Sequence, residues 1–220
     1  MAERPDIKFC GLTRPADAEL AASLGARYVG VILVGGPRLV TPARASLVFD
    51  AARGPARVAV VSVGEPADLA ALGHAAGADI LQLHADPTPE LVRALREHWK
   101  GGIWAAVRLG GGGVPSVWSQ LFGVADAVVT DTAVPGGLGG SGVRFDWAAH
   151  RALVEKSRVG GRFVLAGGLT PGNIPDAIRA LAPDVVDVSS GVEDTLGVKS
   201  PELMRAFSRA VASSSPTLQA

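Results

Sequence analysis

A repeated alternation of short apolar runs and proline-marked helix starts is the feature that most constrains the fold of this chain. The prolines that carry the rhythm recur at intervals of 23 to 30 residues, apart from one interval of 56, and are Pro15, Pro42, Pro66, Pro89, Pro115, Pro171 and Pro201. A hydroxyl residue precedes four of them, at Thr41, Thr88, Thr170 and Ser200. The hydroxyl can cap free backbone N–H groups, and proline at the first helical position loses no donor. The pattern therefore predicts a series of helices that start near these prolines.

Eight short runs rich in apolar and β-branched residues precede the helical segments. They are Ile7–Cys10, Tyr28–Leu33, Arg57–Val61, Ile80–Leu83, Ile103–Val107, Ala127–Thr130, Arg162–Ala166 and Val185–Val188. Such runs are typical of parallel strands that are covered on both faces. Eight strand–helix units predict an α/β protein, a compact (β/α)₈ TIM barrel in a single domain over residues 1–212, with a disordered tail over 213–220. A doubly wound open sheet shares the alternation and is the structural alternative.

Composition narrows the function classes. The 220 residues carry 21 Lys+Arg against 21 Asp+Glu, and 48% are apolar, so disorder is excluded for most of the chain and a nucleic-acid partner is disfavoured. A single cysteine allows no internal disulfide, and the four histidines lack metal-ligand spacing. We expect no secretory signal, no membrane span and no obligate protein partner. We expect a cytoplasmic protein without a metal or cofactor.

Two glycine-containing turns follow the seventh and eighth predicted strands. Gly167 and Gly168 lie in the first turn, and Ser189 and Ser190 precede Gly191 in the second. Such turns offer backbone N–H groups and hydroxyls, and phosphate sites of (β/α)₈ barrels are frequently built in these two loops. Either turn alone is equally well explained by a tight change of direction. The two together favour a phosphate site and hence a small phosphorylated substrate.

Three further side chains lie at predicted strand ends or in the loops that follow them. Cys10, the lone thiol, ends the first run, and Asp131 follows the sixth. A thiol and a carboxyl group that face each other across a barrel mouth would form an acid–base pair. The alternatives are a small buried hydrophobic residue for Cys10 and a loop cap for Asp131. Arg38, in the loop after the second run, is either a surface charge or a fork for a substrate carboxylate.

Several motifs, in this order, resemble those of the phosphoribosylanthranilate isomerase family. They are Lys8–Thr13, Gln82–His84, Asp131–Thr132, Gly139–Gly142 followed by Phe145–Trp147, Gly167–Asn173 and Val186–Glu193. The resemblance runs from about residue 7 to residue 211, which is nearly the whole chain. The combination is specific, although no single motif is.

The resemblance implies a cofactor-free (β/α)₈ barrel of tryptophan biosynthesis that catalyses an Amadori rearrangement of N-(5-phosphoribosyl)anthranilate. It implies that Asp131 is the general acid that opens the ribose ring and that Cys10 is the general base that removes the C2′ proton. Arg38 matches the arginine that holds the anthranilate carboxylate, and His84 lies in a substrate-binding motif. The residues that match the phosphate-binding turns are Gly167, Gly168, Asp187, Ser189 and Ser190.

Departures from the family pattern leave the substrate range open. The family's third strand usually continues into Phe-Val-Asn, whereas this chain reads Val-Ser-Val-Gly-Glu over Val61–Glu65, and Arg108 follows the fifth run unexpectedly. A further departure is Ala85, which stands where glycine is usual. The residues alone also allow a different sugar-phosphate reaction on the same barrel, or a non-catalytic barrel that binds a phosphosugar. The presence of both Cys10 and Asp131 argues against the non-catalytic alternative.

Overall fold

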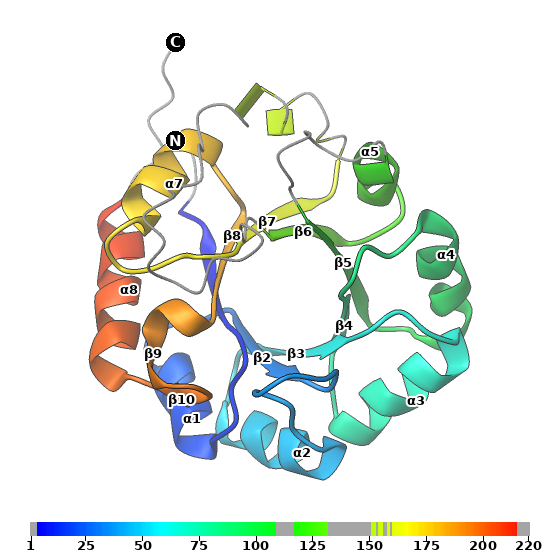
Figure 1. Cartoon of the computed structure of the whole chain (residues 1–220), viewed down its shortest axis with the longest axis horizontal. Helices are drawn as coiled ribbons and strands as arrows, with labels where there is room; N and C mark the ends of the chain where they lie inside the picture. The colour runs from blue at the N-terminus through cyan, green and yellow to red at the C-terminus, as the bar shows by residue number, and fades with distance from the viewer. Residues whose placement is uncertain are drawn as a thin grey trace.

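Eight parallel strands form a closed barrel surrounded by helices (Figure 1). The computed structural model describes residues 4–108, 117–131, 151–152, 154–155, 158 and 160–214. The strands are β1 Asp6–Phe9, β2 Tyr28–Ile32, β3 Ala56–Val61, β4 Ile80–Leu83, β5 Gly102–Arg108, β6 Ala127–Asp131, β7 Arg162–Ala166 and β8 Val185–Val188. Each strand pairs with its sequence neighbour, and β1 pairs with β8. The predicted (β/α)₈ barrel is confirmed, since the doubly wound alternative would leave two open edges.

The described helices lie outside the barrel. They are α1 Pro15–Ser23, α2 Pro42–Ala51, α3 Pro66–Ala76, α4 Pro89–His98, α5 Val117–Phe122, α7 Ile174–Leu181 and α8 Pro201–Ser213. Five of them begin at a proline of the predicted rhythm. The hydroxyls of Thr41, Thr88 and Ser200 accept hydrogen bonds from backbone N–H groups three residues on, at 3.2, 3.3 and 3.5 Å. These three caps confirm the chemistry that the sequence pattern predicted.

The predicted helix start at Thr170 and Pro171 is wrong, because α7 begins only at Ile174. Asn173 is the physical reason. Its Oδ1 accepts from the Thr170 backbone N–H at 2.8 Å, and its Nδ2 donates to the Gly168 carbonyl at 2.9 Å. The intervening residues therefore form a turn that braces the glycine loop, a local alternative to helix that asparagine favours.

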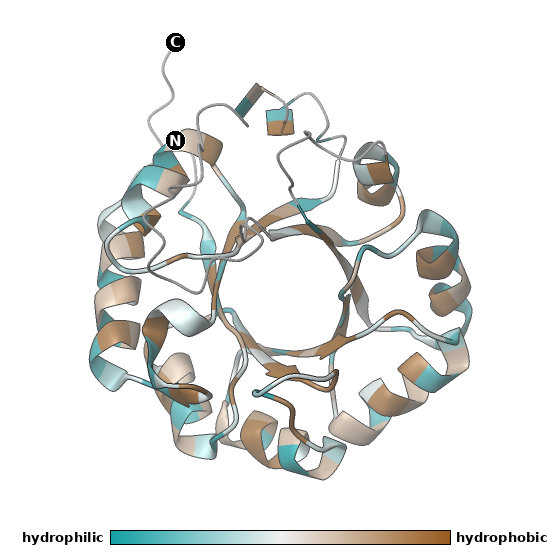
Figure 2. Ribbon diagram, viewed as in Figure 1, coloured by the Kyte–Doolittle hydropathy of each residue, from teal (hydrophilic) through white to brown (hydrophobic). Residues whose placement is uncertain are grey.

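Two apolar layers hold the fold together, and Figure 2 shows largely brown, hydrophobic strands, with most of the teal on the surrounding helices and loops. The larger layer lies between strands and helices. The smaller layer fills the barrel and comprises Tyr28, Val58, Trp104, Ala106, Ala127, Val129, Val164 and Val185. This division follows from side chains alternating between the two faces of each strand.

Packing closes the amino end of the barrel. The rings of Tyr28 and Trp104 meet edge to face with centroids 4.8 Å apart. Arg162, the first residue of β7, donates to the Tyr28 hydroxyl at 2.7 Å and to Asp6 at 2.7 Å. The carboxyl ends of the strands are therefore the end that remains for a ligand.

A small hairpin that the strand pattern did not anticipate follows β8. A short 3₁₀ turn, Ser190–Val192, leads into the antiparallel strands β9 Glu193–Thr195 and β10 Val198–Lys199.

At the carboxyl-terminal boundary of the predicted domain, α8 includes Ser213, and the Ser214 hydroxyl donates to the Ala210 carbonyl at 2.6 Å. The rest of the predicted tail, 215–220, lies outside the described residues. Within the described part, no helix is both long and apolar enough to cross a membrane.

Candidate active site

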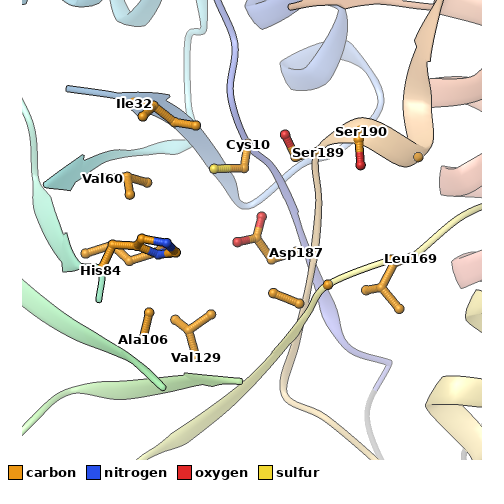
Figure 3. A pocket seen from close by; sticks show the side chains of 15 residues that line it. Cys10, Ile32, Val60, His84, Ala106, Val129, Leu169, Asp187, Ser189 and Ser190 are labelled. Carbon is orange, nitrogen blue, oxygen red and sulfur yellow. The ribbon is translucent and has the colours of Figure 1, made fainter. Parts of the chain in front are cut away.

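A cavity of about 280 Å³ opens at the carboxyl ends of the strands (Figure 3). Its lining includes seven of the nine predicted site residues, which are Cys10, His84, Gly167, Gly168, Asp187, Ser189 and Ser190. Ile32, Val60, Ala106 and Val129 supply an apolar wall. The cavity thus combines acid–base groups, turn glycines and hydroxyls with an apolar surface, as a site for a small organic anion requires.

The turns after β7 and β8 lie directly against each other. Gly167 and Gly168 have φ angles of +90° and +62°, a left-handed conformation that glycine adopts without strain. A Cβ atom at Gly191 would lie 1.8 Å from the carbonyl oxygen of Leu169, so only glycine fits at this contact. The two predicted phosphate-binding turns therefore form one continuous surface at the cavity wall.

Cys10 follows β1 and lies in the cavity wall with 7% of its surface exposed. Its backbone N–H donates to the Val188 carbonyl of β8 at 2.9 Å, which holds the residue in the barrel wall. Burial raises the pKa of the thiol, and the nearby Lys8 ammonium opposes that rise. Cys10 is therefore a buried thiol with a charged neighbour, which distinguishes it from an inert core cysteine.

Asp187 forms a buried ion pair with Lys8. Lys8 Nζ donates to Asp187 Oδ2 at 2.7 Å, and the two side chains are 0% and 6% exposed. Burial alone would lower the pKa of Lys8, but Asp187 and Cys10 outweigh burial and raise it. Figure 3 shows the Asp187 carboxylate on the same wall of the cavity as the Cys10 thiol. The role of Asp187 in phosphate binding stays a prediction, and its observed partner is the Lys8 ammonium.

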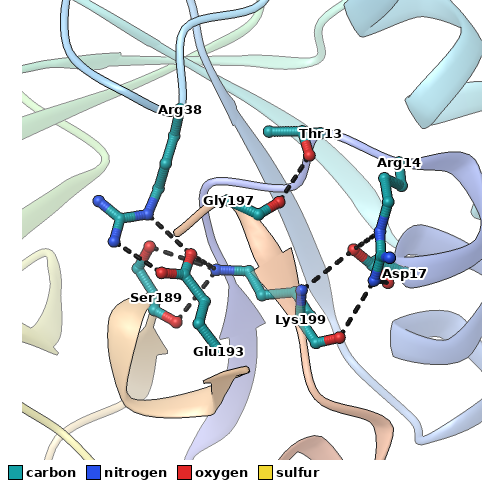
Figure 4. A network of polar contacts seen from close by, with 8 residues as sticks. All are labelled: Thr13, Arg14, Asp17, Arg38, Ser189, Glu193, Gly197 and Lys199. Carbon is teal, nitrogen blue, oxygen red and sulfur yellow. Dashed lines mark hydrogen bonds and ion pairs between the residues drawn. The ribbon is translucent and has the colours of Figure 1, made fainter. Parts of the chain in front are cut away.

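Arg38 lies beside the cavity and pairs with Glu193 (Figure 4). Its Nε donates to Glu193 Oε1 and its Nη2 to Oε2, both at 2.7 Å. A Cβ atom at Gly11 would lie 2.7 Å from Arg38 Cδ, so the glycine lets the arginine stem pass close to the end of β1. The fork leaves Nη1 outside the ion pair. Arg38 is therefore held firmly in place rather than free on the surface.

Lys199 of β10 joins this ion pair to the turn after β8. Its Nζ donates to Glu193 Oε1 at 2.9 Å, to the Ser189 carbonyl at 3.0 Å and to the Ser189 hydroxyl at 3.4 Å. Its backbone is held in turn, since Arg14 Nη2 donates to the Lys199 carbonyl at 3.1 Å and Asp17 accepts from its N–H at 3.4 Å. Glu193, Arg38, Lys199 and Ser189 form one polar network, which we call the loop network.

Asp131 is the last residue of β6, where it lies in register with Arg108 of β5 and Ala166 of β7. Its side chain lies outside the described part of the chain, as do Thr132, Gly139–Gly142 and Phe145–Trp147. The strand end itself borders the cavity, because Val129, two residues earlier, lines it. The acid role of Asp131 stays a prediction.

Two departures from the family pattern, at Ala85 and Arg108, lie together beside the cavity. Ala85 has a φ angle of +70°, a left-handed conformation that explains why glycine is usual at this position. The next residue, Asp86, accepts a hydrogen bond from the Arg108 backbone N–H at 3.0 Å. The Arg108 side chain is exposed and is not part of the cavity lining.

The sequence pattern did not single out Lys8, Gln82, Glu193 or Lys199 as site residues. A signal for Lys8 was present, because a charged residue inside an apolar, doubly covered strand needs a buried partner. Gln82 is 5% exposed and lines the cavity, and its Oε1 has no hydrogen-bond partner among the described residues. That oxygen is an acceptor for a ligand donor.

The groups around the cavity provide acid–base and anion-binding chemistry. They are a thiol, an imidazole, a carboxylate, an ammonium group and two hydroxyls, from Cys10, His84, Asp187, Lys8, Ser189 and Ser190. Across the described ranges, no three His, Cys, Asp or Glu residues gather as metal ligands would.

The fold and this cavity define a (β/α)₈-barrel enzyme whose candidate site places a thiol, an imidazole and a carboxylate beside two glycine turns. Residues 7–210 match the family model of N-(5'phosphoribosyl)anthranilate (PRA) isomerase. The N-(5'-phosphoribosyl)anthranilate isomerase of Afipia carboxidovorans is 40% identical over 96% of this chain and 91% of its own length. The chain belongs to the phosphoribosylanthranilate isomerase family.

Solved structures agree with this assignment. The phosphoribosyl anthranilate isomerase of Thermus thermophilus superposes with a TM-score of 0.79 at 32% identity, over 94% of this chain and 98% of that one. A second isomerase, solved in complex with reduced 1-(o-carboxyphenylamino)-1-deoxyribulose 5-phosphate, superposes with a TM-score of 0.78 at 25% identity, over 94% and 98%.

Proposed function

We propose that this chain converts N-(5-phosphoribosyl)anthranilate into 1-(2-carboxyphenylamino)-1-deoxyribulose 5-phosphate, an Amadori rearrangement of tryptophan biosynthesis. The observation that carries the proposal is the cavity that brings the Cys10 thiol together with the paired turns after β7 and β8. The related isomerase bound to a reduced form of this product supports it, because that ligand carries a phosphate and a carboxylate.

Cys10 and Asp131 divide the proton transfers in this proposal. Asp131 donates a proton to the ribose ring oxygen, the ring C–O bond breaks, and the anthranilate nitrogen forms a Schiff base with C1′. The Cys10 thiolate then removes the C2′ proton, and its electron pair moves to give an enolamine. Tautomerisation to the ketone completes an isomerisation without gain or loss of atoms. The position of Cys10 in the cavity wall supports its part in this scheme.

The remaining cavity residues bind the two ends of the substrate. The phosphate lies against the backbone N–H groups and hydroxyls of the turns at Gly167–Gly168 and Ser189–Ser190. Arg38 binds the anthranilate carboxylate, and its observed pairing with Glu193 orients the guanidinium for that contact. His84 lies across the cavity from Asp187 (Figure 3). In this proposal it faces the sugar that links the two ends of the substrate.

Loss of substrate fluorescence during turnover by the purified protein tests the proposal. Cys10→Ala and Asp131→Asn are each expected to lower kcat by about 10²–10⁴-fold, the usual contribution of a positioned acid or base. Ser190→Ala is the matched control, since loss of one phosphate donor raises KM with kcat largely retained. Near-normal turnover in both catalytic variants would show that the assigned roles are wrong.

A further inference from the structure

Lys8 of β1 is a buried cation beside two acidic groups, the Cys10 thiol just after β1 and the Asp187 carboxylate of β8. Its Nζ lies 2.7 Å from Asp187 Oδ2, and its side chain is fully buried. A Cβ atom at Gly30 of β2 would lie 3.2 Å from Lys8 Nζ and 3.1 Å from Cys10 Sγ. The ammonium and the thiol therefore border the same small space, which the absence of a side chain at position 30 leaves open.

Backbone pairing holds this arrangement in place. Lys8 and Asp187 are direct partners in the register of β1 with β8. Cys10 lies two residues after Lys8, and residues two apart project from the same face of an extended chain. Three groups from the first and last strands of the barrel are thus brought together by strand register.

The charges of Lys8 and Asp187 act on Cys10 in opposite directions. A thiolate in a buried wall is costly unless a cation lies close to it. The Lys8 ammonium favours the thiolate, whereas the Asp187 carboxylate disfavours it. The other charged or titratable groups around Cys10 in the described structure are His84 just after β4, Lys199 on β10 and Arg38 in the loop after β2. Lys8 is the cation on the same strand, and its position does not depend on a loop.

We propose that Lys8 is a positioning residue that stabilises the anionic form of Cys10 while holding Asp187 beside it. Lys8 then sets the pH range over which Cys10 accepts a proton. The catalytic consequence rests on the proposed function, but the effect on the thiol itself does not. Asp187 has two opposing effects. It holds Lys8 in place, and its negative charge limits how far the Cys10 thiol ionises.

Alkylation of the protein by iodoacetamide as a function of pH measures this effect directly. The chain has one cysteine, so the reaction rate reports Cys10 alone, and only the thiolate reacts. Lys8→Met is expected to move the midpoint of the rate–pH curve upward by about one to three pH units, and Asp187→Asn to move it downward. Lys8→Arg keeps a cation on the strand and is expected to stay near the wild-type midpoint.

The opposite signs separate this role from a merely structural one. Damage to the fold exposes Cys10 and moves both variants toward an ordinary thiol, whereas the proposal requires one upward and one downward shift. Where circular dichroism shows that Lys8→Met is unfolded, the double variant Lys8→Met/Asp187→Asn replaces it, and its midpoint must lie above that of Asp187→Asn. The proposal would be overturned if folded Lys8→Met and Asp187→Asn shifted the midpoint in the same direction. It would also be overturned if Lys8→Met/Asp187→Asn and Asp187→Asn had equal midpoints.

A pH profile of kcat/KM connects the thiol to turnover. Its acid limb reports the base of the free enzyme and is expected to move in the same direction as the alkylation midpoint in each variant. If the wild-type protein rearranges no substrate, the proposed function fails while the alkylation result still stands. If turnover is normal and the alkylation midpoints of the variants do not differ, the proposed function stands and only the proposed role of Lys8 is wrong.

Discussion

Two buried lysines at the same end of the barrel differ in their electrostatics. Lys8, inside the barrel wall, donates to Asp187 at 2.7 Å, and Lys199, in the loop network, donates to Glu193 at 2.9 Å. Both side chains are 0% exposed. Yet Asp187 and Cys10 raise the pKa of Lys8 against the effect of burial, whereas burial lowers the pKa of Lys199.

Burial is the largest cause of the lowered pKa of Lys199, and the number of cations that share the carboxylate adds to the difference between the two sites. Arg38 already occupies both oxygens of Glu193, and its charge disfavours a second cation at Lys199. Asp187 faces Lys8 together with a second acidic group, the Cys10 thiol. The distance to a counter-ion is nearly the same in both regions, so it does not decide the ionisation of a buried lysine. The balance between burial and the charges around each lysine does.

The largest expected effect is on the stability of the barrel wall. Lys8→Met leaves the Asp187 carboxylate buried without its cation, and loss of one partner of a buried pair costs about 3–5 kcal/mol. Urea unfolding monitored by tryptophan fluorescence measures the change. Lys8→Met/Asp187→Asn removes both charges and is expected to recover much of the loss. A smaller loss in Lys8→Met than in Lys199→Met would contradict the comparison.

Lys199→Met is expected to cost less, about 1–3 kcal/mol, because Glu193 keeps its fork to Arg38 and only the contacts to Ser189 go unpaired. The same variant should raise KM, since the turn after β8 loses its anchor. Urea midpoints and steady-state kinetics together test this. Equal stability losses for the two lysine variants would show that sharing of the carboxylate is unimportant.

Glu193→Gln tests whether the loop network orients Arg38. The amide lacks the charge that pairs with the guanidinium, so Arg38 loses its orientation and we expect KM to rise about tenfold, equivalent to about 1.4 kcal/mol, with kcat within about twofold. Glu202→Gln, at an exposed position of α8, is the matched control. A fall in kcat with unchanged KM would place Glu193 in the chemistry instead.

The smallest expected effect is in the acid stability of the loop network. Arg38 and Lys199 outweigh burial and lower the pKa of Glu193. The stabilisation is therefore present above the ordinary glutamate pKa of about 4.3 and is lost as the pH falls through the lower value of the folded state. Urea midpoints of wild type and Glu193→Gln should converge between pH 6 and pH 3. If the difference between the two urea midpoints grew as the pH fell, the pKa of Glu193 would be raised in the folded state and not lowered.

The fold was predictable because its signals are local. All eight strands lie within one residue of the predicted runs at either end, since β-branched apolar segments specify a doubly covered strand by themselves. The start of α7 was missed because the bonds of Asn173 compete with those of a helix.

The site was only partly predictable, because its contacts join distant parts of the chain. Cys10 and the two glycine turns could be placed from strand ends alone. The pairing of Lys8 with Asp187 depends on the register of the first strand with the last, and that of Arg38 with Glu193 on an unanticipated hairpin. Neither register is encoded in a local pattern, and the role of Asp131 stays a prediction.

Closure of the barrel by β1 and β8 also imposes an order of events during synthesis. Lys8 and Asp187 are 179 residues apart, and at about 5–20 residues per second a ribosome needs roughly 10 to 35 seconds to make the chain between them. During that interval the Cys10 thiol is already made, but the strand that completes its surroundings is not. A nascent chain therefore carries the Cys10 sulfur, without Asp187 and the burial that the closed barrel provides, until β8 has been made.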